Sequence, residues 1–288
     1  MYHLIYNPVA GKKSALKNLE IVKKILQERG VEFETHASQE ARECSQIAKE
    51  LTQKGESDII VLGGDGTLHE VLNGLDDPSK CRLGLIPSGT GNDFAEKAGI
   101  PLDAEQAILL ILDGEAKNTD YLQLSDGRRC MNVGGMGMDV DVLERCHKGK
   151  MKGKPKYVLS LLQSLFTFKG YTITVKCEGV EKTHDALIAA VCNGGVFGGG
   201  IPICPSADIH DGKMNVVIVD CIGGVFKLIK AFMVLMKGNI LEYPLTTHYL
   251  CEKVRFTPKK ACVAQLDGEL YKDLTFDVTL CTGLKIYR

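Results

Sequence analysis

Residues 63–75 contain the residue types best suited to chemistry in this chain. They read GGDGTLHEVLNGL and follow the apolar run 59–62. Apolar residues at 68, 71, 72 and 75 recur with helical spacing, so a buried strand, a glycine-rich turn and a helix are predicted in that order. Glycine lets backbone N–H groups approach a ligand, and a helix N-terminus adds unpaired donors, so this turn suits a phosphate group with a cation at Asp65. Its residues are Gly63, Gly64, Asp65, Gly66 and Thr67.

Two further segments have the same character. Residues 83–95 end another apolar run and continue into a helical pattern, with Ser88, Gly89 and Thr90 in the turn and Asp93 as a second candidate for a metal or its water shell. A third turn follows the apolar residues 4–6, and its members are Asn7, Pro8, Val9, Ala10 and Gly11. The Gly-Gly-Asp-Gly segment by itself also fits a plain tight turn closed by an aspartate; the two additional turns favour phosphate.

The order of expected elements indicates how these turns come together. Strands and helices alternate through about residue 120, which predicts a doubly wound parallel sheet. The expected strands are 2–6 and 31–35, with helices at 17–29, 41–52 and 102–112 between or after the glycine turns. Because the carboxyl ends of parallel strands share one edge of a sheet, the three turns are expected to converge on one crevice.

After residue 120 the pattern changes to short β-rich runs. These indicate an antiparallel β-sandwich, interrupted by helices at 157–168 and 225–236. Both helices are apolar around most of their circumference, so we expect them in the core. The resulting domains are 1–120 for nucleotide and 121–283 for substrate.

Five segments together resemble the diacylglycerol kinase catalytic-domain family, and more narrowly its bacterial lipid kinases. The segments are Asn7-Pro8 with Gly11, the Gly63–Thr67 turn, residues 87–94, Leu266-Asp267-Gly268-Glu269, and residues 198–214. The resemblance implies an N-terminal domain like those of NAD kinase and phosphofructokinase, a C-terminal β-sandwich, and a last strand at about 284–288 that returns to the first domain. It also implies that ATP contacts the three turns and Thr35, and that Asp65 and Asp93 hold Mg²⁺ directly or through water.

The late Asp267-Gly268-Glu269 segment supplies the catalytic carboxylates in this interpretation. Phosphoryl transfer to an alcohol requires a group that takes the hydroxyl proton. The family pattern assigns that role to Asp267 or Glu269, with Asp65 as the third catalytic residue, and the sequence does not choose between the first two. Taken alone, the segment also fits an Asp-Gly hairpin turn.

A second Mg²⁺ site is implied by the resemblance alone. It involves Asp208, Asp211 and Lys213, where one aspartate side chain and neighbouring backbone carbonyls would bind the ion. The alternative is a solvated Asp-Gly turn.

Composition excludes several classes of protein. With 288 residues, 44% of them hydrophobic, and a net charge of −1, the chain is expected to form a compact enzyme and not a nucleic-acid binder. Its 11 cysteines include no C-x-x-C pair, which favours free thiols. No signal-peptide pattern follows Met1, so we expect a cytoplasmic protein that contacts the inner face of the cell membrane peripherally. The lysine-rich residues 148–156 are either a lipid-docking segment or a solvated loop.

The sequence therefore predicts an ATP- and Mg²⁺-dependent lipid kinase in phospholipid biosynthesis. Its substrate would be diacylglycerol or a similar lipid alcohol at a membrane surface, the product with diacylglycerol being phosphatidic acid. The alternatives are an NAD kinase-like soluble phosphotransferase and a nucleotide-binding regulator without catalysis. A homodimer is a candidate assembly.

Overall fold

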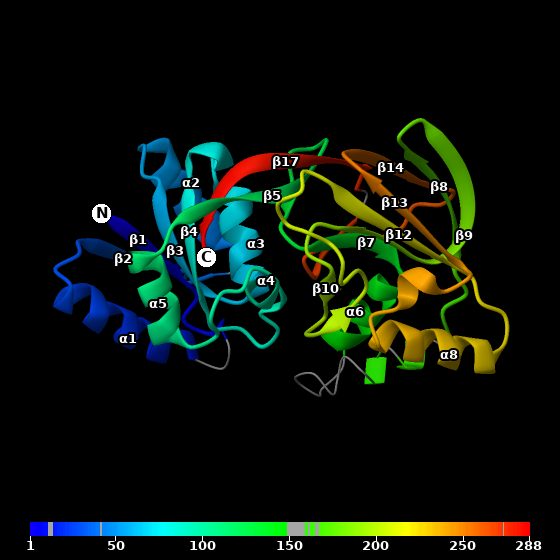
Figure 1. Ribbon diagram of the computed structural model, residues 1–288, viewed down its shortest axis with the longest axis horizontal. Coiled ribbons are helices and arrows are strands. Elements are labelled where there is room, and N and C mark those ends of the chain that lie inside the picture. The colour runs from blue at the N-terminus through cyan, green and yellow to red at the C-terminus, as the bar shows by residue number, and fades with distance from the viewer. Residues whose placement is uncertain (11–13, 41, 149–158, 161, 165–166, 273) are drawn as a thin grey trace. The chain divides into compact units, whose positions relative to one another are not determined.

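The computed structural model describes residues 1–10, 14–40, 42–148, 159–160, 162–164, 167–272 and 274–288 (Figure 1). Contacts within the chain define two compact units. The N-terminal unit comprises Met1–Tyr121 and Thr282–Arg288, and the C-terminal unit comprises Leu122–Cys281.

The N-terminal unit is built on a parallel sheet with the strand order β17-β4-β3-β1-β2. The strands are β1 (Tyr2–Tyr6), β2 (Phe33–Ala37), β3 (Asp58–Gly63), β4 (Arg82–Pro87) and the last part of β17 (Phe276–Tyr287). From β1 the chain adds β2 on one side and then β3 and β4 on the other. The direction of winding therefore reverses between β1 and β3, the place where open α/β sheets bind ligands at the carboxyl ends of their strands.

Two helix pairs cover the two faces of this sheet (Figure 1). Helices α1 (Ser14–Glu28) and α5 (Ala104–Asp113) pack on each other and on the apolar side chains of one face. Helices α2 (Glu43–Gln53) and α3 (Asp65–Gly74) pack together on the other. Gly74 allows this second contact, because a Cβ there would lie 2.1 Å from the Ser45 carbonyl oxygen.

The C-terminal unit is an antiparallel sheet organised around one long strand. Strand β9 (Val180–Cys192) pairs with β7 (Val133–Gly137), β8 (Tyr171–Cys177) and β12 (Met214–Asp220). Two apolar clusters draw on alternate residues of β9: Ala189 and Val191 belong to one, Ile188 and Ala190 to the other. The remaining strands are β6 (Arg129–Cys130), β10 (Val196–Phe197), β11 (Ile201–Pro202), β13 (Thr246–Cys251), β14 (Lys253–Pro258), β15 (Ala264–Leu266) and β16 (Glu269–Tyr271).

Two strands run from one unit into the other. Strand β5 (Ala116–Leu124) crosses the boundary near Tyr121. Strand β17 pairs antiparallel with β14 through Phe276–Thr279 and parallel with β4 through Lys285 and Ile286. The returning strand expected at about 284–288 is thus the last part of a longer strand that begins at Phe276.

The predicted fold class is confirmed, while several element bounds differ. Strand β2 lies two residues later than the expected 31–35, and helix α6 (Met138–Lys148) was not expected. Most of the helix expected at 157–168 and most of the lysine run 148–156 lie outside the described residues. Within the described part of the chain, no helix has the length and apolarity required to cross a bilayer.

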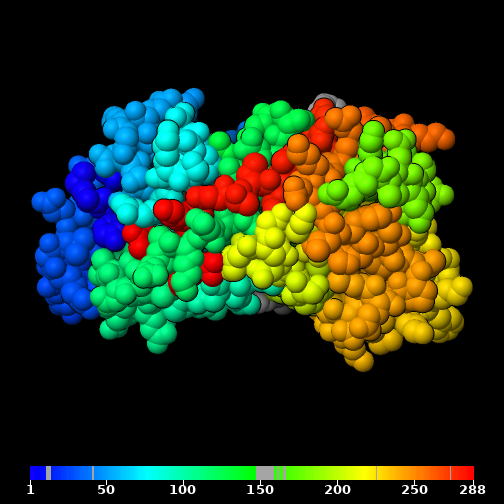
Figure 2. Space-filling view, turned by 45° about the horizontal axis from the view of Figure 1, so that its top comes forward, coloured from blue at the N-terminus to red at the C-terminus, as the bar shows by residue number. Residues whose placement is uncertain are grey.

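Helix α8 (Val225–Met236) corrects the expectation of a fully buried helix. Ala231 and Leu235 are 6% and 5% exposed and belong to an apolar core, whereas Phe226 is 89% exposed. Ile229, Met233 and Met236 are also exposed, so an apolar stripe lies on the outer side of the helix. The yellow-to-orange segment containing α8 forms part of the surface in Figure 2. A helix that is apolar nearly all round does not show from sequence which of its faces remains uncovered.

Candidate active site

The glycine turns after β3 and β4 touch each other through their backbones. The Ser88 N–H donates to the Gly63 carbonyl oxygen over 2.8 Å. A Cβ on Gly64 would lie 2.8 Å from the Gly89 Cα, and one on Gly89 would lie 2.5 Å from the Gly64 Cα. Glycine is therefore required at both positions by space, with neither φ in the left-handed region. The close approach brings the first turn of α3 and the Ser88 turn into one donor-rich surface.

The Asp65 carboxylate joins the same two turns. Its Oδ2 accepts the Asp93 N–H at 3.2 Å and its Oδ1 accepts the Phe94 N–H at 3.1 Å, at the start of the short helix α4 (Asp93–Lys97). Asp93 itself is buried, with 6% of its surface exposed. A carboxylate oxygen has two lone pairs, so an oxygen that accepts a backbone N–H can also contact a cation or its water shell.

Three residues outside the predicted set hold the Ser88 turn. The Ser14 hydroxyl donates to the Ser88 carbonyl oxygen at 2.7 Å, and Asn18 Nδ2 donates to Ser88 Oγ at 2.9 Å. Asn92 has φ of 58° and its Oδ1 accepts the Gly89 N–H at 2.9 Å. The only sequence signal for Ser14 and Asn18 is their spacing of one helical turn, which is too common to identify a site.

The Asn7 side chain stabilises the turn that follows β1. Asn7 Oδ1 accepts the Val9 N–H at 3.0 Å, and the Ala10 N–H donates to the Asn7 carbonyl oxygen at 3.1 Å. Val9 is 72% exposed. Gly11 lies outside the described residues, and Thr35 is exposed on the edge strand β2 opposite Leu4.

The Asp267-Gly268 dipeptide forms a two-residue hairpin turn between β15 and β16. Both residues have positive φ, 51° and 90°, as such turns require. The Asp267 carboxylate accepts the backbone N–H groups of Met131 and Asn132, each at 2.8 Å, and the Cys130 thiol at 3.1 Å. Burial, together with the charge of Asp267, raises the pKa of the Cys130 thiol, which keeps it protonated as a donor.

A buried amide supports this hairpin from below. Gln265 is 2% exposed; its Oε1 accepts the Gly268 N–H at 2.9 Å and its Nε2 donates to Asp139 Oδ2 at 3.2 Å. Burial raises the pKa of Asp139 to about 6. Glu269, in contrast, is exposed at the start of β16. The Asp267 carboxylate therefore serves to hold the hairpin turn in place through its hydrogen bonds, while the Glu269 side chain is exposed to solvent.

Comparison with known proteins adds to this geometry. Residues 1–124 match the model of the diacylglycerol kinase catalytic domain, and residues 132–284 match the YegS C-terminal NAD kinase beta sandwich-like domain. A Yersinia enterocolitica protein named "Probable lipid kinase YegS-like" is 30% identical over 210 residues, covering 71% of each chain. The chain belongs to the diacylglycerol kinase family of lipid kinases.

Further members of this family resemble the chain over more of its length. Bacillus subtilis diacylglycerol kinase is 27% identical over 272 residues, which cover 92% of this chain and 88% of that protein. A crystal structure of a Bacillus anthracis diacylglycerol kinase has a TM-score of 0.77 at 22% identity and covers 99% of this chain and 96% of that one. The structural likeness shows the fold, and the sequence relatives show a kinase with a lipid substrate.

The second metal site suggested for this lipid kinase lies in a turn with local hydrogen bonds. Asp208 Oδ1 accepts the His210 N–H at 3.0 Å and Asp211 Oδ1 accepts the Lys213 N–H at 2.9 Å. The Lys213 ammonium pairs with Glu252 at 2.5 Å, so only its backbone oxygen can serve as a metal ligand. The Mg²⁺ assignment stays a prediction.

Proposed function

We propose that this lipid kinase transfers the γ-phosphate of ATP to the hydroxyl of diacylglycerol or a similar lipid alcohol, giving phosphatidic acid in the first case. The observation that carries the proposal is the backbone contact between Gly64 and Gly89. It joins two donor-rich turns at the carboxyl edge of a parallel sheet, next to the point where the winding reverses.

The phosphate groups of ATP would lie on these turns. The N-terminus of α3 at Asp65–Gly74 offers backbone N–H groups and a partial positive charge. Thr90 adds a hydroxyl, and the Asn7 turn adds a third cradle. The Ser88 hydroxyl is buried and bonded to Asn18 and to the Ile86 carbonyl oxygen, so Ser88 holds the turn in shape and contributes through its backbone. Mg²⁺ would be held by Asp65 and by Asp93, directly or through water, and would neutralise charge between the phosphates.

Glu269 is the group we assign as proton acceptor. Both Asp267 oxygens already accept hydrogen bonds that build the hairpin, so a change in its protonation would disturb the turn. Glu269 is two residues away and exposed, and the described residues give it no hydrogen bond that a substrate would have to break. Asp267 is then a positioning residue for Glu269.

Helix α8 is the surface we propose for membrane contact. Its exposed apolar residues Phe226, Ile229, Met233 and Met236 follow helical spacing. Lys227, Lys230 and Lys237 are exposed on the same segment and suit anionic headgroups. Peripheral contact with an anionic bilayer would bring a membrane-bound alcohol to an enzyme that works from the water side.

The function is tested by offering labelled ATP and Mg²⁺ with three acceptors: diacylglycerol in anionic mixed micelles, sphingosine, and NAD. Label in phosphatidic acid that is lost with Glu269→Gln supports the proposal. Label in NADP supports the soluble phosphotransferase instead. ATP binding without label in any acceptor contradicts the diacylglycerol assignment and favours a different lipid alcohol or a nucleotide-binding regulator.

Membrane contact is tested separately by sedimentation with phosphatidylglycerol vesicles. Phe226→Ser with Met233→Ser should reduce vesicle binding and leave phosphorylation of a short-chain, water-dispersed diacylglycerol unchanged. Leu102→Ser is the matched control, because Leu102 is 50% exposed in the N-terminal unit. Equal binding by all three proteins excludes α8 as the docking surface.

A further inference from the structure

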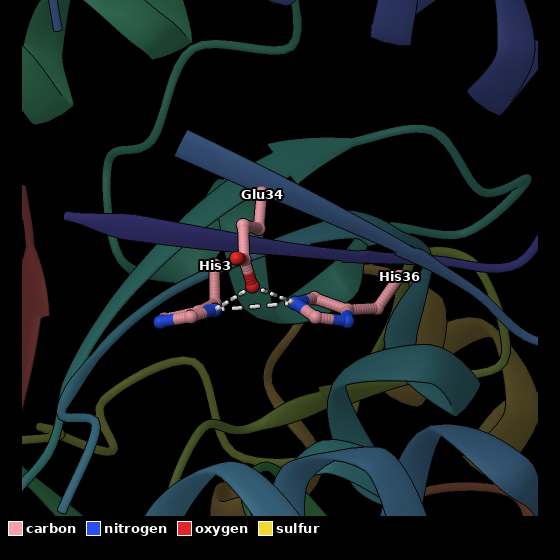
Figure 3. A group of neighbouring side chains, drawn as sticks. All are labelled: His3, Glu34 and His36. Carbon is pink, nitrogen blue, oxygen red and sulfur yellow. Dashed lines mark hydrogen bonds and ion pairs between the residues drawn. The ribbon is translucent and has the colours of Figure 1, made fainter. Parts of the chain in front are cut away.

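Two histidines and a glutamate form a cluster at the edge of the N-terminal sheet (Figure 3). His3 lies on β1, and Glu34 and His36 lie on the edge strand β2. The parallel register pairs His3 with Glu34 and Ile5 with His36, so the three side chains leave the sheet on the same face. None of them belongs to the proposed phosphate turns.

The three donor atoms are spaced as metal ligands are. His3 Nδ1 lies 3.1 Å from His36 Nε2 and 3.6 Å from Glu34 Oε2, and His36 Nε2 lies 3.8 Å from the same oxygen. Figure 3 shows all three atoms pointing toward one another. A point equidistant from atoms so spaced lies about 2.0 Å from each, which matches zinc bonded to imidazole nitrogen and carboxylate oxygen.

A second carboxylate acts on the far side of His3. Glu56 Oε2 lies 3.1 Å from His3 Nε2, a charge contact without good hydrogen-bond geometry, and the His3 side chain is only 2% exposed. This carboxylate lies behind the ring, on the side of His3 away from His36 and Glu34. Carboxylates are commonly placed behind metal-binding histidines in this way.

A hydrogen bond between the two imidazoles explains less of the arrangement. It would use His3 and His36 and leave the Glu34 carboxylate at 3.6 to 3.8 Å from both rings, too far for a hydrogen bond. A cation at the centre accounts for all three groups. Glu34 is 57% exposed, so water can reach a fourth position.

We propose that His3, Glu34 and His36 bind a divalent transition-metal ion, with Zn²⁺ best suited to two imidazoles and one carboxylate. The ion would link the edge strand β2 to β1 and would be separate from the Mg²⁺ of phosphoryl transfer. Mg²⁺ prefers oxygen ligands and six-coordinate geometry, so it does not fit this site.

The direct test is a cobalt titration of chelator-treated wild-type protein, followed by displacement with zinc. The expected result is one Co²⁺ per chain with visible d–d bands and no thiolate-to-cobalt charge-transfer band. The last condition matters because the chain has 11 cysteines. No saturable cobalt or zinc binding, or a thiolate band alone, overturns the proposal.

Variants on the exposed edge strand locate the site. His36→Gln and Glu34→Gln should each weaken cobalt binding by more than the roughly 10-fold that loss of an outer carboxylate costs, while Glu56→Gln should cost about 10-fold. Glu32→Gln removes the same charge beside the site, and His248→Gln removes a histidine from β13; both should bind as wild type does. Unchanged cobalt affinity in His36→Gln contradicts the assignment.

Thermal unfolding separates a metal site from a simple hydrogen bond. Zinc should raise the melting temperature of the wild type relative to that of His36→Gln at the same zinc concentration, because both unfolded chains bind zinc through the same cysteines and only the wild type adds the folded site. If His36→Gln lowers the melting temperature and zinc has no effect on either protein, the two imidazoles form only a hydrogen bond and the proposal fails.

Discussion

The turns at Asp65 and Asp267 use the same residue type in two different settings. Asp65 begins a helix in the N-terminal unit, and its carboxylate accepts two N–H groups from the start of α4. Asp267 sits in a hairpin of the C-terminal unit and accepts N–H groups from residues 131 and 132. In both cases the aspartate builds the backbone shape. In the proposed function Asp65 would also contact Mg²⁺ or its water shell, whereas the proton would go to the exposed side chain of Glu269 and not to Asp267.

The largest expected effect comes from Glu269→Gln. This change removes the assigned proton acceptor, so kcat should fall by about 10²- to 10⁴-fold while ATP affinity and the melting temperature stay near wild type. Steady-state kinetics measures kcat, and a nucleotide-binding assay measures the ATP affinity. Glu181→Gln, another exposed glutamate of the C-terminal unit, is the control. A wild-type kcat in Glu269→Gln would contradict this assignment and favour Asp267 as the proton acceptor.

Asp267→Asn tests the other half of the same distinction. An amide keeps one acceptor oxygen and replaces the other with a donor that faces backbone N–H or the Cys130 thiol. The free energy of unfolding should fall by about 1–3 kcal/mol, measured by chemical denaturation. A variant with normal stability and no turnover would show that Asp267 acts in the chemistry itself.

Gly89→Ala tests the backbone contact of the N-terminal turns. Its Cβ would lie 2.5 Å from the Gly64 Cα, so the two turns must separate, at a cost of about 1–3 kcal/mol and a marked loss of ATP affinity. Gly223→Ala is matched in size and meets no heavy atom within 4 Å. Calorimetric titration measures the ATP affinity of both variants. Equal affinities would show that ATP binding does not depend on the contact between Gly64 and Gly89.

Asp139→Asn tests the support beneath the hairpin through pH. Burial raises the folded-state pKa of Asp139 from 3.8 to about 6, so the folded protein binds this proton more tightly than the unfolded chain. This group therefore makes the free energy of unfolding fall as pH rises from about 4 to 6, by up to about 3 kcal/mol. The asparagine variant should lose that decline and be more stable at pH 7.5. Denaturation at several pH values checks it, and identical profiles would contradict it.

The smallest expected effect belongs to Asp65→Asn as a structural change. The amide keeps one acceptor for the N-terminus of α4, so stability should fall by only about 1 kcal/mol. Its effect on Mg²⁺-dependent turnover should be much larger if Asp65 contacts the ion or its water. Small effects on both stability and Mg²⁺-dependent turnover would show that Asp65 only caps the N-terminus of α4.

Local sequence patterns predicted those parts of the site that lie within one short, continuous segment of the chain. A buried strand, a glycine turn and a helical stripe are continuous in sequence, so the Gly63–Thr67 turn and the Ser88–Thr90 turn were placed on the correct elements. The same local reasoning misplaced β2 by two residues and missed α6, whose first residues, MDVDV, alternate apolar and acidic side chains as those of a strand do. It also could not choose between Asp267 and Glu269, because both carboxylates look alike in the sequence.

The sequence by itself determined the fold class, the family and the positions of the glycine turns, because periodicity and motif spacing act over short stretches. Tertiary structure decided which residues from distant parts of the chain come into contact. Asp267 meets residues 130–132 only after the strands between them pair. His3 meets His36 only through the register of two parallel strands. Such contacts depend on side-chain packing between distant segments, which no short window of sequence contains.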